Sequence, residues 1–184
     1  MAAETHTTSA SNDSASATPP KAAGIGTAVA FDWGLSAEFL TLAVLDVLGH
    51  RATGGQLAPV VVVLALLLGA GACFALGEAL RRGNRLAWIA QVAINSVLLP
   101  GGLLLLPGTF ADLGQHHFGG IIPNAILLFV DPVLVWLLTR SRTRAWVRTT
   151  TAAEAAARHG GRWLAITLPY AVILGVLVAL SAYY

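Results

Sequence analysis

The stretch that decides the fold reads GGIIPNAILLFVDPVLVWLLTRSRTRAWVR and covers residues 119–148. Its first part is mostly apolar, and about twenty residues of helix at about 1.5 Å each reach roughly 30 Å, the thickness of a bilayer's hydrocarbon core. An arginine cluster follows at one end: Arg140, Arg142, Arg144 and Arg148. Basic residues gather on the cytoplasmic side of membrane helices. The stretch therefore predicts a transmembrane helix and its orientation.

The composition is that of a membrane protein. The chain has 184 residues, of which 56% are hydrophobic and only 11% are charged, whereas soluble domains carry about 25% charged residues. A lipid-facing surface explains this shortfall, so we expect an all-α, polytopic transmembrane helical bundle. The basic residues are mostly arginines in predicted loops, which favours topology signals and contacts with anionic lipid headgroups over nucleic-acid binding.

The hydrophobic pattern divides the chain into a tail and one transmembrane domain, residues 23–184. Residues 1–22 are rich in Ser, Thr, Ala and Pro and predict a disordered tail. Five apolar segments predict membrane spans, at about residues 23–50, 57–80, 86–106, 119–139 and 163–184. Pro107 is expected to end the third span. Residues 141–159 predict a basic cytoplasmic helix that stops at a Gly pair.

The number of spans depends on the first segment, because it carries Asp32, Glu38 and Asp46. If this segment only lies at the membrane interface, four spans remain. Five are favoured because a half-inserted segment would leave its backbone groups without hydrogen bonds. With five spans, all but Arg51 of the 11 Lys and Arg residues fall on one side. This bias predicts an inner-membrane protein with a cytoplasmic N-terminus and an external C-terminus.

Polar side chains within the predicted spans are candidates for function, since they are costly in a bilayer. Helical spacing places Asn124 and Asp131 on one face, and Gln91 and Asn95 on another. The predicted intramembrane polar cluster consists of Asp32, Glu38, Asn95, Asn124 and Asp131. The spans contain no Lys or Arg to neutralise the acids.

Three interpretations of Asp131 follow from this lack of a cation. A neutral Asp131 could join helices through a hydrogen bond to Asn95 or to a backbone carbonyl freed by Pro132. The cluster could instead form a proton or cation pathway. A basic residue of another subunit could also pair with the acid. In each case Asp131 is expected to face the bundle interior.

Metal and cofactor sites have weak support in the sequence. His50, Asp112, His116 and His117 all fall on the predicted outer side, with Asp46 one turn before His50, and two histidines with two carboxylates could bind zinc or copper there. Adjacent histidines cannot both point one way on a regular element, however, so exposed loop histidines are expected. We expect no metal and no cofactor.

The two arginine-bearing turns resemble those of a known class of proteins. Residues 76–88 read LGEALRRGNRLAW, and residues 137–146 read LLTRSRTRAW. These segments are similar to the Gly-Leu-x-Arg-Gly-x-Arg-x-Ala-Trp turn and the Leu-Leu-x-Arg-x-x-x-Arg-Ala-Trp/Phe exit of small bacterial inner-membrane proteins of unassigned function. The resemblance covers roughly residues 57–148, and a fifth span beyond it departs from that pattern. It implies no activity and no functional residues.

The sequence contains none of the common enzyme signatures, such as H-E-x-x-H, G-x-S-x-G or a phosphate-binding glycine loop. The leading hypothesis is a non-enzymatic structural or accessory membrane protein. Its partners would be the bilayer, with anionic headgroups at the arginine segment, and a membrane-protein partner or a second copy. The alternative is a small proton- or cation-conducting transporter or channel subunit.

Overall fold

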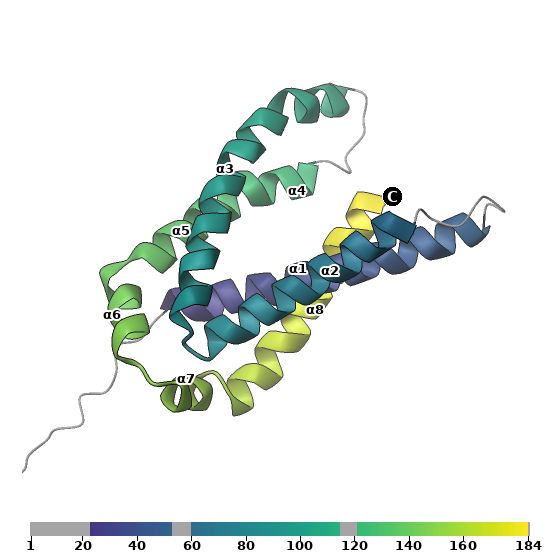
Figure 1. Cartoon of the computed structure of the whole chain (residues 1–184). Coiled ribbons are helices and arrows are strands. Elements are labelled where there is room, and N and C mark those ends of the chain that lie inside the picture. The colour runs from purple at the N-terminus through teal and green to yellow at the C-terminus, as the bar shows by residue number, and fades with distance from the viewer. Residues whose placement is uncertain (1–22, 53–59, 115–120, 184) are drawn as a thin grey trace, which may run out of the picture.

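The computed structural model describes residues 23–52, 60–114 and 121–183, so the predicted tail lies outside the described residues. Within these ranges the chain is helical and contains no strand (Figure 1). The elements, in chain order, are α1 (Ala23–Ala52), α2 (Val60–Arg81), α3 (Arg85–Gly114), α4 (Ile121–Ala125), the π-helix η1 (Ile126–Val130), α5 (Asp131–Thr139), α6 (Ser141–Thr149), α7 (Ala152–Arg158) and α8 (Gly161–Tyr183). The predicted all-α fold is confirmed for this part of the chain.

Helices of membrane length make up most of the described structure. Four are long and apolar enough to cross a bilayer: Gly24–Gly49, Val60–Arg81, Arg85–Ala111 and Gly161–Ser181. The remaining apolar helix, Ile126–Thr139, is shorter. The structure thus supports a membrane-embedded protein and supplies four candidate spans, where the sequence predicts five.

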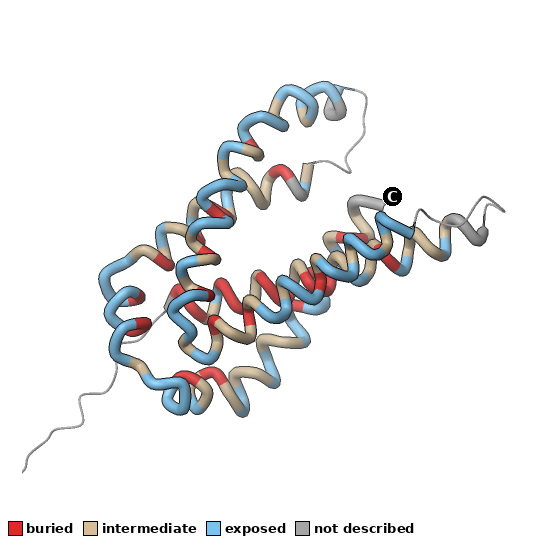
Figure 2. Tube along the Cα trace, viewed as in Figure 1, coloured by how far each residue is buried: buried red, intermediate tan, exposed pale blue. Residues whose placement is uncertain are grey.

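Helix α1 is the centre of the bundle, although its three acids make it the least apolar of the predicted spans. Helices α2 and α8 lie along it, and together they form one arm of the molecule (Figure 1). Buried positions recur along α1, as Figure 2 shows, and they include Ile25, Val29 and Trp33. Because α1 is covered by protein on several sides, its acids need not face lipid.

Glycines allow α1 to approach its neighbours closely. On α8, a side chain at Gly175 would collide with the Gly34 carbonyl oxygen of α1. On α2, a Cβ atom at Gly77 would lie 3.0 Å from the Asp32 Cβ atom. Small residues at helix contacts are the usual means of packing helices in a bilayer, where the hydrophobic effect does not drive them together.

Helix α3 continues through both of its prolines, Pro100 and Pro107, and ends at Gly114. The expectation that Pro107 ends this helix is therefore wrong. Proline is tolerated inside membrane helices because side chains and local adjustments compensate for the lost backbone hydrogen bond. Pro107 cannot donate to the Leu103 carbonyl, four residues before it. Close to this point the Thr109 hydroxyl donates to the Leu105 carbonyl at 3.1 Å.

Helices α4, η1 and α5 follow one another without a break and run antiparallel to α3, as the second arm of the molecule (Figure 1). Near one end the Trp88 indole donates to the Leu138 carbonyl at 3.0 Å. Near the other end the Asn124 amide donates to the Thr109 hydroxyl at 2.8 Å. These two contacts bracket the hairpin, so α5 returns the chain to the end where α3 begins.

The arginine-bearing segments meet at one end of the bundle, where α6, α7 and the turn between α2 and α3 lie (Figure 1). The turn contains Gly83 at φ 75, a left-handed conformation that favours glycine, and a Cβ there would contact Ala155 and Trp146. The segment predicted as one basic helix forms two helices, α6 and α7. Thr151 separates them by capping α7: its hydroxyl accepts from the Glu154 N–H at 3.3 Å.

The tryptophans do more than mark membrane interfaces. Trp33 and Trp146 are buried in the core, and Trp88 and Trp163 pack against it. Only Trp136 is largely exposed, at 56%. Interfacial anchoring, the usual role of tryptophan in membrane proteins, therefore fits Trp136 best.

Candidate functional site: a buried polar group between the two arms

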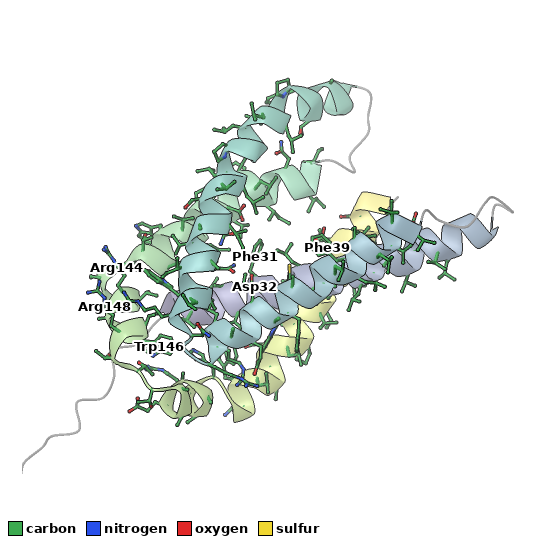
Figure 3. The ribbon with its side chains drawn as sticks, viewed as in Figure 1. Phe31, Asp32, Phe39, Arg144, Trp146 and Arg148 are labelled. Carbon is green, nitrogen blue, oxygen red and sulfur yellow. The ribbon has the colours of Figure 1, made fainter. Side chains whose placement is uncertain are left out.

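A hydrogen bond between side chains joins the two arms in the interior of the protein. The Gln91 amide nitrogen on α3 donates to the Asp32 carboxylate on α1 at 2.7 Å, and both side chains are buried. Figure 3 places Asp32 in the central part of the bundle, next to Phe31. A buried amide–carboxylate bond of this kind holds two helices in a fixed register.

Asn95 lies one turn further along α3 and is also buried. Its amide donates to the Gln91 backbone carbonyl at 2.9 Å, so it is used within its own helix. The predicted hydrogen bond from Asn95 to Asp131 is not formed. Of the polar pair on this face of α3, Gln91 makes the contact between helices.

Asp131 begins α5 and is fully buried, with 0% of its surface exposed. Its backbone N–H donates to the Ile126 carbonyl, which closes the π-helical turn that precedes it. Pro132 explains this local geometry, because its missing N–H and its ring disturb the regular hydrogen-bond pattern of an α-helix. Single π-turns of this kind are frequent at functional sites.

The carboxylate of Asp131 has an unusual environment. Neither of its oxygens has a hydrogen-bond partner among the described residues, and the same holds for Asp32 Oδ2 and Gln91 Oε1. Buried polar atoms without partners cost free energy. The Trp88–Leu138 and Thr109–Asn124 contacts join the two sides of the α3–α5 hairpin. Along the chain, Asn95 lies between these contacts on α3, and Asp131 lies between them on the other side. Asp131 thus lies in the interior of the protein, within the α3–α5 hairpin.

The other predicted members of the polar cluster lie elsewhere. Asn124 bonds to Thr109 near the far end of the α3–α5 hairpin. Glu38 lies on α1 and lines an apolar pocket between α1, α5 and α8. The structure therefore brings Asp32 together with Gln91, places Asn95 beside them, and separates Asn124 and Glu38 from this group.

The arginines of α6 are held on the outside of the bundle. Thr143, Trp146 and Val147 of this helix are buried, and the Thr143 hydroxyl donates to the Leu137 carbonyl at 2.8 Å. Arg142, Arg144 and Arg148 are exposed on the opposite face, and Figure 3 shows Arg144 and Arg148 along its outer side. Arg140 is also exposed, and its guanidinium lies 3.5 Å from the centre of the Trp136 ring.

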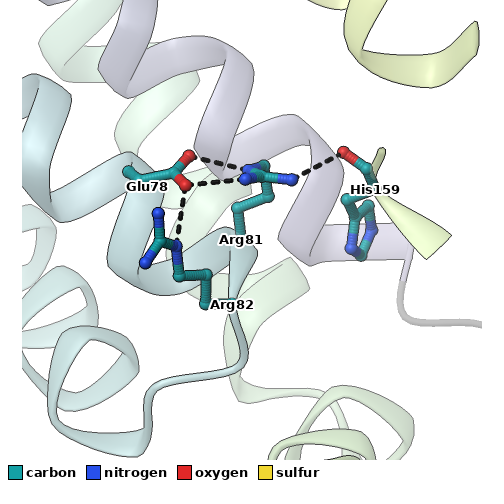
Figure 4. A network of polar contacts seen from close by, with 4 residues as sticks. All are labelled: Glu78, Arg81, Arg82 and His159. Carbon is teal, nitrogen blue, oxygen red and sulfur yellow. Dashed lines mark hydrogen bonds and ion pairs between the residues drawn. The ribbon is translucent and has the colours of Figure 1, made fainter. Parts of the chain in front are cut away.

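A second basic group ties α2 to the segment before α8 (Figure 4). Glu78 accepts hydrogen bonds from Arg81 at 2.6 and 2.7 Å and from Arg82 at 2.8 Å. Arg81 also donates to the His159 carbonyl at 3.2 Å. The sequence predicts the pairing of Glu78 with Arg82; the contact with His159, 78 positions from Arg81, has no local sequence signal.

The candidate metal ligands are not tested by the structure. His116 and His117 lie outside the described residues, and the side chains of His50 and Asp112 are likewise not described. Among the side chains that are described, no group of three His, Cys, Asp or Glu residues could hold a metal ion.

The predicted polar cluster omits Gln91, although Gln91 makes the hydrogen bond to Asp32. The spacing of Gln91 from Asn95 marks a shared polar face of α3, but an amide is a weaker signal than a carboxylate. The signal that could have found it is the expectation that Asp32 has a donor within the bundle, because most buried polar groups have a hydrogen-bond partner. The pocket beside Glu38 has no sequence signal, since packing alone creates it.

Comparisons with known proteins identify no relative. No protein-family model matches the chain, and neither a curated protein nor a solved structure matches it. A proposal for function therefore rests on the chemistry of the described residues.

Proposed function

We propose that this protein is a non-enzymatic accessory subunit of the inner membrane, which contacts anionic lipid headgroups through the arginines of α6. The observation that carries the proposal is the two-sided character of α6. Trp146 and Thr143 hold one face in the bundle, while Arg142, Arg144 and Arg148 extend from the other. Exposed guanidinium groups on an anchored helix suit phosphate groups, which arginine binds in a bidentate manner.

Five spans are the topology that we propose. Helix α3 leaves the arginine-bearing end, and α8 begins near it, so the chain must return between them. The segment Ile126–Thr139, together with α4 before it, makes this return alongside α3. At about 1.5 Å per residue, α4, η1 and α5 together reach nearly 30 Å, enough to cross the hydrocarbon core. The arginine-bearing end would then face the cytoplasm and the C-terminus the outside.

Lipid retention tests the proposed headgroup contact. The purified full chain is titrated in neutral detergent with phosphatidylglycerol or phosphatidylcholine, and bound lipid is counted by native mass spectrometry. We expect selective retention of phosphatidylglycerol, and its loss in the triple variant R142Q/R144Q/R148Q. The control is R85Q, an exposed arginine at the start of α3, which should change retention little. Equal retention of both lipids, or no effect of the triple variant, would contradict the proposal.

Proton or cation conduction is the second candidate, and the unpartnered carboxylate of Asp131 favours it. A buried acid at a π-turn is a typical element of a proton relay. A proton or cation path through the bundle would have to reach this carboxylate from both membrane surfaces. The flux of protons, Na⁺ and K⁺ into proteoliposomes decides between conduction and the accessory role: flux that exceeds that of empty vesicles and is abolished by D131N would establish conduction.

A further inference from the structure

A pocket of about 330 Å³ opens between the two arms, on the side of α1 that faces α8 and α5. Its wall is almost entirely apolar, with residues from α1, η1, α5 and α8. The residues that give it chemical character are Phe31, Glu38 and Tyr170. Its volume lies within the range of small-molecule sites, which are typically apolar cavities with a few polar groups.

The pocket lies beside the glycines at the crossing of α1 and α8. Gly34 and Gly175 both line it, and the helix backbones approach closely there because neither residue carries a side chain. An apolar space of this size next to an acid is a distinct feature of the bundle.

Glu38 is the only carboxylate in the described pocket wall, which contains no Lys, Arg or His. Among the described residues, none forms a hydrogen bond or an ion pair with the Glu38 carboxylate. Glu78, near the end of α2, instead pairs with two arginines. Glu38 lies near the middle of the candidate span Gly24–Gly49, far from aqueous counter-ions. An ionised Glu38 would therefore take its complementary positive charge from the occupant of the pocket, whereas the empty site would favour the protonated acid.

The aromatic residues suit the same kind of occupant. Phe31 and Tyr170 both line the pocket, and the face of an aromatic ring attracts a cation through the ring quadrupole. An anionic lipid would be repelled by Glu38, and a bare acyl chain would leave the carboxylate uncompensated. A cation with apolar substituents satisfies the charge, the rings and the apolar wall together.

We infer that this pocket binds a hydrophobic organic cation, an ammonium or phosphonium with apolar substituents, with Glu38 as its counter-ion. The site lies apart from the arginines of α6 and does not depend on their role. The Asp32–Gln91 pair is also separate, since neither residue lines the pocket.

Binding of tetraphenylphosphonium to the full chain in neutral-detergent micelles tests this inference, with equilibrium dialysis as the readout. We expect saturable binding that E38Q weakens about tenfold or more, since the charge pair is lost. The matched control is D46N, an acid on the same helix outside the pocket wall, which should bind as the unmodified protein does. L174W, which fills the pocket from α8, should also abolish binding.

Two further measurements keep the test decisive. Each variant is first shown to elute as a single species, and E38D, which keeps the charge, should retain more binding than E38Q. Triphenylphosphine oxide, an uncharged aromatic probe, should bind far more weakly than the cation. Equal binding of the neutral probe, or binding that is unaffected by E38Q, would indicate a site for an acyl chain or an apolar helix and would overturn the inference. The absence of saturable binding would overturn it as well.

Discussion

The Gln91 amide lies 2.7 Å from the Asp32 carboxylate, across the interface between α3 and α1. These two residues are 59 positions apart in sequence, and their bond joins the arm made of α3, η1 and α5 to the arm made of α1, α2 and α8. Interhelical hydrogen bonds in membranes contribute up to about 1 to 2 kcal/mol. This bond is therefore expected to set how the two arms meet.

Removal of the Gln91 amide tests that role. Q91L leaves the Asp32 carboxylate buried without a partner and should lower the free energy of unfolding by about 1 to 2 kcal/mol. The measurement is unfolding in mixed micelles of increasing SDS fraction. S96A, an exposed position on the same helix, is the control and should change stability by less than about 0.5 kcal/mol. An equal effect of both variants would show that the bond does not join the arms.

The two tryptophans near the arginine end make a matched pair. Trp146 is 0% exposed and Trp136 is 56% exposed. W146L removes buried ring atoms from the contact between α6, α7 and the α2–α3 turn, and should cost about 2 to 4 kcal/mol of unfolding free energy. W136L should cost much less, because Trp136 faces outward. Thermal unfolding in detergent measures both, and a larger effect of W136L would contradict the described packing.

His159 should make stability depend on pH. Burial lowers the pKa of its imidazole below the ordinary value of 6.5, and the nearby charges of Arg158 and Arg81 act in the same direction, against a hydrogen bond with the Ala155 backbone. The native state therefore binds a proton less readily than the unfolded state. This contribution to stability is complete above about pH 6.5 and is lost as the pH falls below it.

The matched variant isolates that effect. H159F keeps an aromatic ring against Trp146 and Trp163 but cannot titrate. The decrease in melting temperature between pH 7.5 and pH 5.5 should be smaller in H159F than in the unmodified protein. An identical decrease in both proteins would show that other groups cause the pH dependence.

The buried carboxylate of Asp131 is expected to lower the free energy of unfolding. Both of its oxygens are buried without a described partner, so D131N should leave the free energy of unfolding nearly unchanged. D131L removes the unsatisfied group and should raise stability by about 1 kcal/mol. SDS unfolding measures both variants. A strong loss of stability in D131L would show that Asp131 has a structural hydrogen bond, and would favour its role in joining helices.

The sequence predicts the parts of this fold that depend on local composition. Apolar length and arginine placement predict the membrane-length helices and the basic end, because both follow from the bilayer itself. The pairing of Glu78 with Arg82 follows from their spacing on one helix. Proline is a weaker guide: α3 continues through Pro107, since a membrane environment tolerates proline within helices.

Features that depend on which helices touch could not be predicted. The central place of α1, the choice of Gln91 instead of Asn95 as the partner of Asp32, and the burial of Trp146 all require the packing of distant segments. The pocket beside Glu38 requires it too, because residues of α1, η1, α5 and α8 line that pocket. In each case the sequence of one helix face is compatible with packing against several other helices.

Topology is the central claim, and reporter fusions test it most directly. A cytoplasm-dependent fluorescent protein and an export-dependent phosphatase are each placed between Thr150 and Thr151 and, separately, after Tyr184, always with the full chain present. The account predicts fluorescence without phosphatase activity at the α6–α7 turn, and the reverse at the C-terminus. A fluorescent C-terminal fusion, or both sites on the same side of the membrane, would contradict it.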